Sequence, residues 1–136
     1  MTTADLLSRP PDWVTLRAET DEGLPIVVLV DRAIATTAPY AGYPVQVAVA
    51  VALGQTDDGL PAEPDKDRLR TLEQALVDAA AGEARLVAVM TLEGVREWML
   101  YARSTAWAEP FVAAGISVQA AEDPGYQGLF ELAGSP

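Results

Sequence analysis

The segment 58–103 constrains the fold more than any other part of the chain. Its first half carries apolar residues at helical spacing, namely Leu69, Leu72, Leu76 and Ala80. Two apolar runs follow, Arg85–Leu92 and Val95–Arg103, and Glu93-Gly94 separates them. Because Gly accepts a positive φ at no steric cost, this spacing is typical of a β-hairpin. The segment therefore predicts a helix followed by two strands that pair around a tight turn.

The clearest strand pattern is Val45–Leu53, in which four valines and Leu53 alternate with Gln46 and three alanines. Neither face of this strand carries a charge, so we expect it to be central in its sheet. We expect the helix over residues 64–82 to pack across it, with Pro64 in the first turn of the helix. Gly82 suits the end of that helix, since a helix commonly ends at a residue of positive φ.

The N-terminal part of the chain adds two strands. Trp13–Glu19 alternates, Leu24–Asp31 is rich in Val and Ile, and turn residues lie between them. Residues 1–12 predict an N-terminal arm that is mobile or forms a short helix. Residues 13–136 predict a single α+β domain, as the length of the chain also indicates.

The C-terminal part predicts one more helix and one more strand. The helix is expected to end at Ala114, and Pro110 either kinks it or delays its start. A strand over Ile116–Ala121 follows, and the tail is expected to fold back onto the body. Without the first two strands, the order is strand, helix, strand, strand, helix, strand. This order predicts a ferredoxin-like split βαβ sandwich, an antiparallel sheet with two helices on one face, with an extra N-terminal β-hairpin.

The residue types that are absent exclude several chemistries. The chain has no Cys and no His, which excludes disulfides, thiol nucleophiles and Ser-His-Asp triads. A Ser-Lys pair would need Lys66, the single Lys, on a helix start that we expect to face solvent. No phosphate-binding glycine loop and no nucleophile-elbow string occurs. We therefore expect no cofactor and no catalytic residues.

A hard-cation site is the metal alternative. Asp57, Asp58, Asp65 and Asp67 supply oxygen ligands of the kind that Mg²⁺ and Ca²⁺ take. Their spacing fits no calcium loop, and acidic residues before a helix are favoured by the helix dipole alone. We expect these carboxylates to face solvent and to lie apart. An enzyme that uses Mg²⁺, or a carboxylate pair such as Glu73 with Glu97, stays a further alternative.

The charge balance bears on partners. Nine basic against twenty acidic residues give a net charge of −11 and a pI near 4.2. Nucleic acid and anionic membranes are therefore disfavoured as partners, because both are bound through Lys and Arg. The first residues lack the pattern of a signal peptide, and Val45–Leu53 is too short to span a bilayer. These features predict a soluble, cytoplasmic protein.

Arg96 is the most informative candidate site residue. Strand alternation places it on the same face as Trp98, towards the helices, where an unpaired guanidinium would be costly. One interpretation is a structural ion pair with Glu73 that fixes helix to sheet. The other is an anion or partner site formed by Arg96 with nearby aromatic and tail residues, namely Trp98, Tyr101, Asp123 and Tyr126. The alternative role of these aromatic residues is packing in the core. The alternative role of Asp123-Pro124 is to form a turn that starts the tail.

Several residues occur in the order and spacing of a known family, namely Trp13, Pro44, Asp58-Gly59-Leu60-Pro61, Leu69, Glu73, Gly94-Val95-Arg96-Glu97, Tyr101 and Asp123-Pro124. On these residues the chain resembles domain-of-unknown-function family 695 from Trp13 to Phe130. Members usually have Trp and then Tyr after the final Asp-Pro, where this chain has Tyr126 and Phe130. The difference implies an aromatic slot rather than a specific indole or hydroxyl.

The resemblance implies little about activity, because the family has none assigned. Some members resemble, or are joined to, a small acidic regulator that inhibits ribonuclease E, which implies a regulatory binding role. We therefore expect a non-catalytic acidic module that engages a protein partner, as a monomer or a homodimer. A small-molecule or anion sensor that uses Arg96 and nearby aromatics is the alternative.

Overall fold

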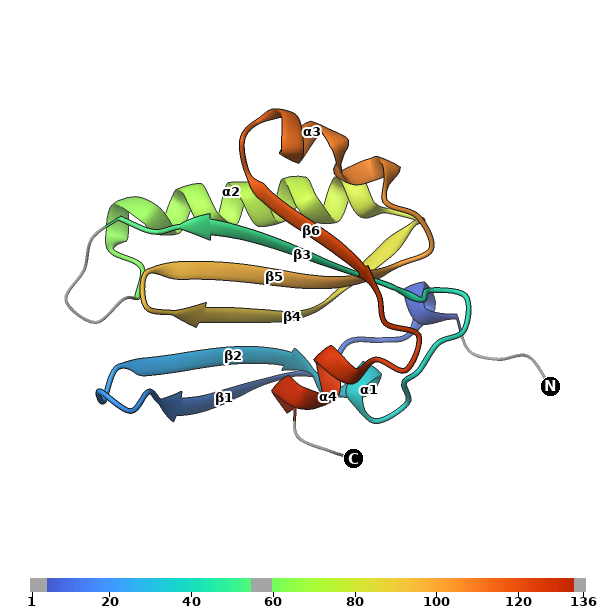
Figure 1. The fold of residues 1–136 in the computed structure, drawn as a ribbon, viewed down its shortest axis with the longest axis horizontal. Coiled ribbons are helices and arrows are strands. Elements are labelled where there is room, and N and C mark those ends of the chain that lie inside the picture. Colours follow the sequence, from blue (N-terminus) through green and yellow to red (C-terminus); the bar gives the residue numbers. More distant parts are fainter. Residues whose placement is uncertain (1–4, 55–59, 134–136) are drawn as a thin grey trace.

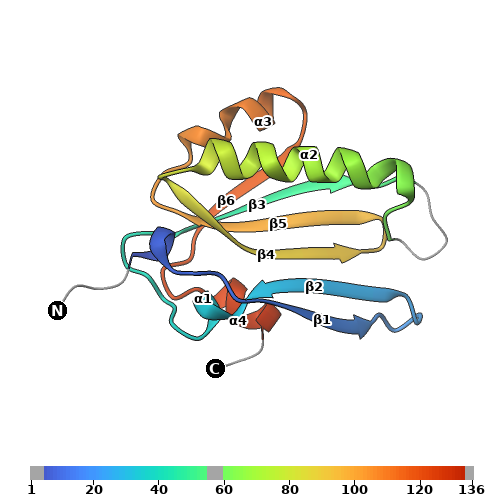
Figure 2. The same ribbon diagram turned by 180° about the vertical axis from the view of Figure 1, so that it is seen from behind.

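The described residues, 5–54 and 60–133 of a computed structural model, form one six-stranded antiparallel sheet with four helices (Figures 1 and 2). The strand order in the sheet is β1-β2-β4-β5-β3-β6. The strands are β1 (Trp13–Glu19), β2 (Pro25–Asp31), β3 (Val45–Ala52), β4 (Ala84–Leu92), β5 (Val95–Ala102) and β6 (Ser117–Glu122). The helices are α1 (Arg32–Ala35), α2 (Glu63–Ala80), α3 (Glu109–Ala113) and α4 (Gln127–Ala133). Two short 3₁₀ helices cover Leu6–Ser8 and Ala106–Ala108.

The β4–β5 hairpin confirms the prediction from the turn residues. Leu92 pairs with Val95, and the two residues between them, Glu93 and Gly94, have φ values of 48° and 80°. Two successive positive φ angles define the tight turn whose twist matches that of the flanking strands. This hairpin carries the most central pairing of the sheet.

The strand Val45–Ala52 lies inside the sheet, with antiparallel neighbours β5 and β6 on its two sides. Val47 and Val49 are fully buried and share a core with Leu69 and Leu76 of α2. The alternation of valines therefore selects the face that α2 covers, as the sequence predicts. β6 forms the edge beyond β3, so β3 is one strand away from that edge.

A second core occupies the opposite face of the sheet. Val28 and Val30 of β2 pack there with Ile34 of α1 and Leu129 of α4. Figure 1 shows α1 and α4 side by side beyond the end of β2. Leu6 of the N-terminal arm is also fully buried in this core. Of the two alternatives for the arm, the structure thus shows the short helix, a 3₁₀ turn over Leu6–Ser8, and its Leu6 holds it in place.

The C-terminal part follows the predictions with one addition. Pro110 is the second residue of α3, where its missing N–H is tolerated, so of the two alternatives the structure shows the delayed start, after a 3₁₀ turn. The tail folds back as expected but does so as the helix α4, which the sequence analysis does not predict. Asp123 and Tyr126, described below, fix the start of that helix.

Candidate functional site

The aromatic residues predicted to bind a ligand or partner are core residues. Trp98, Tyr101 and Tyr126 are all fully buried. The indole Nε1 of Trp98 donates a hydrogen bond to Glu73 Oε1 at 2.9 Å. None of these three rings is open to solvent, so packing, rather than ligand contact, explains their positions.

Glu73 approaches the hairpin as predicted, but it contacts Trp98 in place of Arg96. The ion pairs among the described residues include none between Glu73 and Arg96, and Arg96 Nε donates instead to Thr91 Oγ1 at 3.0 Å. Arg96 lies two residues along β5 from Trp98, a displacement of about 6.6 Å. Burial lowers the pKa of Arg96, and the attraction of Glu73 partly offsets this effect. The Trp98–Glu73 hydrogen bond thus links α2 to β5, and Arg68 Nη2 links α2 to the Ala52 carbonyl of β3.

Asp123 organises the start of α4. Its Oδ2 accepts hydrogen bonds from Tyr101 Oη at 2.7 Å and from the Gly128 amide at 3.0 Å, while its Oδ1 accepts from the Gln127 amide at 3.0 Å. Gln46 Nε2 lies 3.3 Å from both Asp123 Oδ2 and Tyr101 Oη. Burial opposes ionisation of Asp123, yet the hydrogen bonds from Tyr101 and the two amides outweigh it and lower its pKa. Asp123 therefore acts as a cap and a clamp for the tail.

Tyr126 completes this clamp. Its ring stacks on Tyr101 with centroids 3.7 Å apart, and its hydroxyl donates to the Tyr43 carbonyl at 2.9 Å. Its φ is 56°, a conformation that few residues other than Gly adopt. Burial raises the pKa of Tyr101 and of Tyr126, and it is the largest cause of the shift in each. The position after Asp123-Pro124 that we expect to be an aromatic slot is thus an internal packing position.

Of the carboxylates considered for a metal, Asp67 faces solvent as expected, but the Asp65 side chain is only 15% exposed, because it binds a backbone amide and Arg68. Asp65 Oδ2 accepts from the Gly54 amide at 2.6 Å, and Asp67 pairs with Arg70 at 3.1 Å on the exposed face of α2. Asp57 and Asp58 lie outside the described residues. Within residues 5–54 and 60–133, no group of three or more acidic side chains could hold a metal ion.

A groove of about 660 Å³ lies between the C-terminal half of α2 and the β2–β4 part of the sheet. Its apolar lining comes from α2 and the sheet, namely Trp13, Leu29, Val77, Leu86, Val89 and Leu100. Leu7, Arg9 and Pro11 of the N-terminal arm contribute to its lining. Trp13 and Val77 are 41% and 45% exposed, which is unusual for large apolar side chains that line the same depression. The groove is therefore the candidate functional site.

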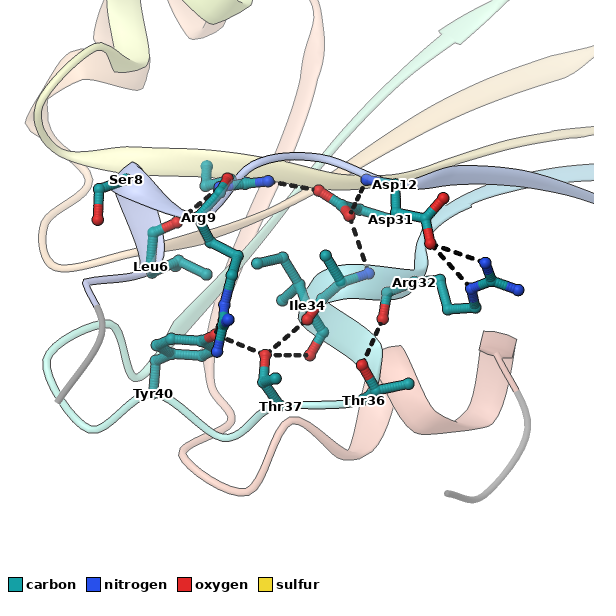
Figure 3. A network of polar contacts seen from close by, with 12 residues as sticks. Leu6, Ser8, Arg9, Asp12, Asp31, Arg32, Ile34, Thr36, Thr37 and Tyr40 are labelled. Atoms are coloured by element: carbon teal, nitrogen blue, oxygen red, sulfur yellow. Dashed lines mark hydrogen bonds and ion pairs between the residues drawn. The ribbon is translucent and has the colours of Figure 1, made fainter.

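A buried ion pair lines the groove. Arg85 Nη2 lies 2.6 Å from Oδ2 of Asp31, which is fully buried. Asp31 Oδ1 accepts hydrogen bonds from the amides of Asp12 and Ala33, at 3.0 and 3.1 Å. Figure 3 shows Asp31 where the arm, β2 and α1 meet. The pair joins elements that are distant in sequence.

Arg85 also binds the backbone of the arm. Its Nη1 donates to the carbonyl of Leu6 at 2.8 Å and to the carbonyl of Arg9. The Arg9 side chain lies against Tyr40, whose hydroxyl accepts from Arg9 Nε at 3.1 Å (Figure 3). The guanidinium of Arg85 thus fixes the arm that borders the groove, and its charge is matched by that of Asp31.

The groove wall formed by α2 carries negative charge, whereas the arm on the other side of the groove contributes the guanidinium of Arg9. Glu73 lines the wall, and the last turn of α2 carries no basic residue that would offset the partial negative charge of its carbonyl groups. The charge of Arg85 is already neutralised by Asp31. An apolar ligand with a positive charge directed at α2 would therefore complement this wall.

The sequence analysis names Glu73 as a candidate site residue and Trp13 as a strand residue, but it assigns no site role to Trp13 or to the other groove residues. One signal was available, since Asp31 ends a Val- and Ile-rich strand and Arg85 begins another apolar strand. A charged residue at the end of each of two buried strands indicates a pair when those strands are neighbours. That neighbourhood, β2 beside β4, was not predictable from the local patterns.

No helix in the part of the chain that the structure describes is long and apolar enough to cross a membrane.

The comparisons with known proteins identify a family and no further relative. No curated protein and no solved structure is significantly similar to the chain. A family model described as a family of unknown function, DUF695, matches residues 11–127. This span includes the whole sheet, the groove-lining residues from Pro11 onwards and Asp123 with its partner Tyr101, and the chain belongs to the DUF695 family.

Proposed function

We propose that this protein is a non-catalytic acidic binding module, with a regulatory role, that engages a protein partner through the groove beside α2. The observation that carries the proposal is the exposure of Trp13 and Val77 within one apolar depression. Exposed large apolar side chains that gather in a concave site are characteristic of binding surfaces.

The partner segment we propose is apolar and basic. The net charge of −11 attracts cationic segments over long range, and Glu73 with the C-terminal end of α2 provides the negative wall. Electrostatic complementarity of this kind accelerates association and selects against acidic partners. Apolar side chains of the segment would pack on Trp13 and Val77, and a Lys or Arg would face Glu73.

The proposal does not give the buried charges a catalytic role. Asp31 accepts two amide hydrogen bonds and the Arg85 ion pair, and Arg85 donates to two backbone carbonyls. These contacts account for the pair as an anchor of the arm. A general base needs an acceptor that is directed at a substrate proton, and Asp31 directs its oxygens at protein groups.

Tryptophan fluorescence tests the proposal. Trp98 and Trp107 are 0% and 9% exposed, so a shift in emission on ligand binding reports chiefly on Trp13. We expect a short peptide of alternating Leu and Lys to shift the emission to shorter wavelength in a saturable way. The same peptide with Glu in place of Lys should have no effect, and Trp13→Phe should abolish the response. Equal responses to the two peptides would contradict the charge argument.

A small amphipathic molecule is the second candidate occupant, because a volume of about 660 Å³ lies within the range of small-molecule pockets. This sensor function would use the groove rather than Arg96 and the buried aromatics. A thermal-shift screen with small amphipathic cations separates the two candidates. A saturable rise in melting temperature with such a compound, together with no response to the peptide, would favour the small molecule.

We also propose a ferredoxin-like fold and a cytoplasmic location for this module. The elements from β3 to β6 follow the order β-α-β-β-α-β, and their strands are arranged β4-β5-β3-β6. This arrangement supports a ferredoxin-like unit, which the antiparallel β1–β2 pair extends as an N-terminal hairpin. We place the module in the cytoplasm, which cell fractionation would test.

A further inference from the structure

The outer side of β1 is open. β1 stands first in the strand order and pairs with β2 alone among the described strands (Figure 1). Six of its seven residues are exposed. It contains no Pro, no Lys and no bulge, which are among the devices that keep an edge strand from pairing with another chain, and its two charged residues, Arg17 and Glu19, have opposite signs.

The hydrogen-bonding phase of β1 is fixed by the contacts at the two ends of its ladder. Arg32 N donates to Asp12 O, and Thr20 N donates to Leu24 O, both at 2.8 Å. In an antiparallel ladder, alternate residues direct their N–H and C=O groups towards the same neighbour. The residues whose backbone groups point away from β2 are therefore Trp13, Thr15, Arg17 and Glu19.

We propose that β1 pairs antiparallel with β1 of a second copy, around a two-fold axis at Leu16, to give a continuous twelve-stranded sheet. In this register Trp13 lies opposite the partner's Glu19, and Thr15 lies opposite the partner's Arg17. All four of these residues direct their backbone groups outward, so each pair exchanges two hydrogen bonds, about eight in total. The register uses the full length of the strand.

The side chains agree with this register. Leu16 is 38% exposed and would pack on the partner's Leu16 at the axis, where two residues that are not hydrogen-bonded to each other approach most closely. No like charges lie directly opposite each other. A shift of one pair towards the C-terminal end of β1 would place Arg17 opposite the partner's Arg17, and like charges directly opposite are destabilising. Self-complementarity of one patch is what a two-fold interface requires.

Salt separates this interface from the groove. Each copy carries a net charge of −11, so the two copies repel and added salt should strengthen the dimer. A basic segment in the groove is held partly by attraction, and salt should weaken it. Opposite salt dependences therefore keep the two proposals distinguishable, and either can fail without the other.

Cysteine cross-linking tests the register, because the chain has no Cys of its own. In the proposed dimer the Cα atoms of the two Leu16 residues are about 4.5 Å apart, which a disulfide can span. We expect Leu16→Cys to form a covalent dimer under mild oxidation at least tenfold faster than Ala18→Cys, whose position faces the partner's Val14. Faster cross-linking of Ala18→Cys would overturn the register.

Charge variants test the interface without a disulfide. We expect sedimentation equilibrium to show a dimer for the native chain, and monomers for Leu16→Asp and Leu16→Lys alone. A mixture of these two variants should restore the dimer, because opposite charges would then meet at the axis. Val112→Asp, at an exposed site on α3, is the matched control and should stay dimeric. A native chain that is monomeric at high concentration in 0.5 M salt would overturn the proposal.

Discussion

The Arg85→Met variant is the most severe test of the Asp31–Arg85 ion pair, which anchors the arm at the border of the groove. It removes the guanidinium that contacts the fully buried Asp31 at 2.6 Å and keeps most of the aliphatic volume. Breaking a buried ion pair by removing one partner costs about 3–5 kcal/mol, because the other charge stays buried. Asp31 retains the amide hydrogen bonds from Asp12 and Ala33, so we expect about 3 kcal/mol, the lower end of this range.

Urea denaturation followed by circular dichroism measures this loss. At a slope of about 2 kcal/mol per molar urea, the midpoint should fall by roughly 1.5 M. Arg70→Met is the control, because Arg70 pairs with Asp67 on the exposed face of α2, and its midpoint should be nearly unchanged. The double variant Asp31→Leu with Arg85→Met should recover most of the loss.

Two results would refute this reasoning. A fall of less than 0.3 M in the Arg85→Met midpoint would mean that the buried carboxylate does not depend on its cation. A double variant no better than the sum of the single ones would mean that the two residues act independently. Hydrogen exchange adds a local readout, since the arm should lose protection around Leu6 when its carbonyl loses Arg85 as a donor.

The other predictions concern the tail, the hairpin and metals. Because the pKa of Asp123 is lower in the folded state, its contribution to stability is present above about pH 4 and is lost as the pH falls below that, so Asp123→Asn should flatten the acid limb of stability against pH. Tyr101→Phe should cost about 1.5–3 kcal/mol through loss of its hydrogen bond to the Asp123 carboxylate, and an unchanged urea midpoint would contradict the clamp. In double-mutant cycles that measure the free energy of unfolding, the coupling energy of Glu73 with Trp98 should exceed that of Glu73 with Arg96. The reverse order would support the ion pair that the sequence predicts. EDTA should leave the melting temperature unchanged, whereas a fall would indicate a metal site.

Local patterns in the sequence predict the strands and the main helix well. Alternation along Val45–Leu53 identifies an interior strand and its core-facing residues, because each side chain in a strand points to one of two faces. Glu93-Gly94 identifies the hairpin through Gly94, which adopts a φ of 80° at no steric cost, although Glu93 also has a positive φ, which its residue type does not predict. These features are properties of a few neighbouring residues, which is why they can be read from the chain.

The site could not be predicted in the same way, since it depends on which strands become neighbours. The groove exists because β2 lies beside β4 and the arm crosses towards Arg85. The predicted cluster around Arg96 placed Trp98 and Tyr101 together, although these residues are three positions apart on β5 and therefore point to opposite faces of the sheet. The Asp123 clamp shows the same limit, because Asp-Pro indicates a turn and gives no sign of the distant hydroxyl that binds the carboxylate.

The most direct test of the groove as a binding site is a calorimetric titration with the Leu–Lys peptide. It compares Val77→Lys on the rim of the groove with Val112→Lys, a valine of similar exposure on α3. Both substitutions change the net charge equally, so a difference between them reports position alone. We predict that Val77→Lys weakens binding at least tenfold, while Val112→Lys binds within about twofold of the native chain. Equal affinities for the two variants would contradict the account.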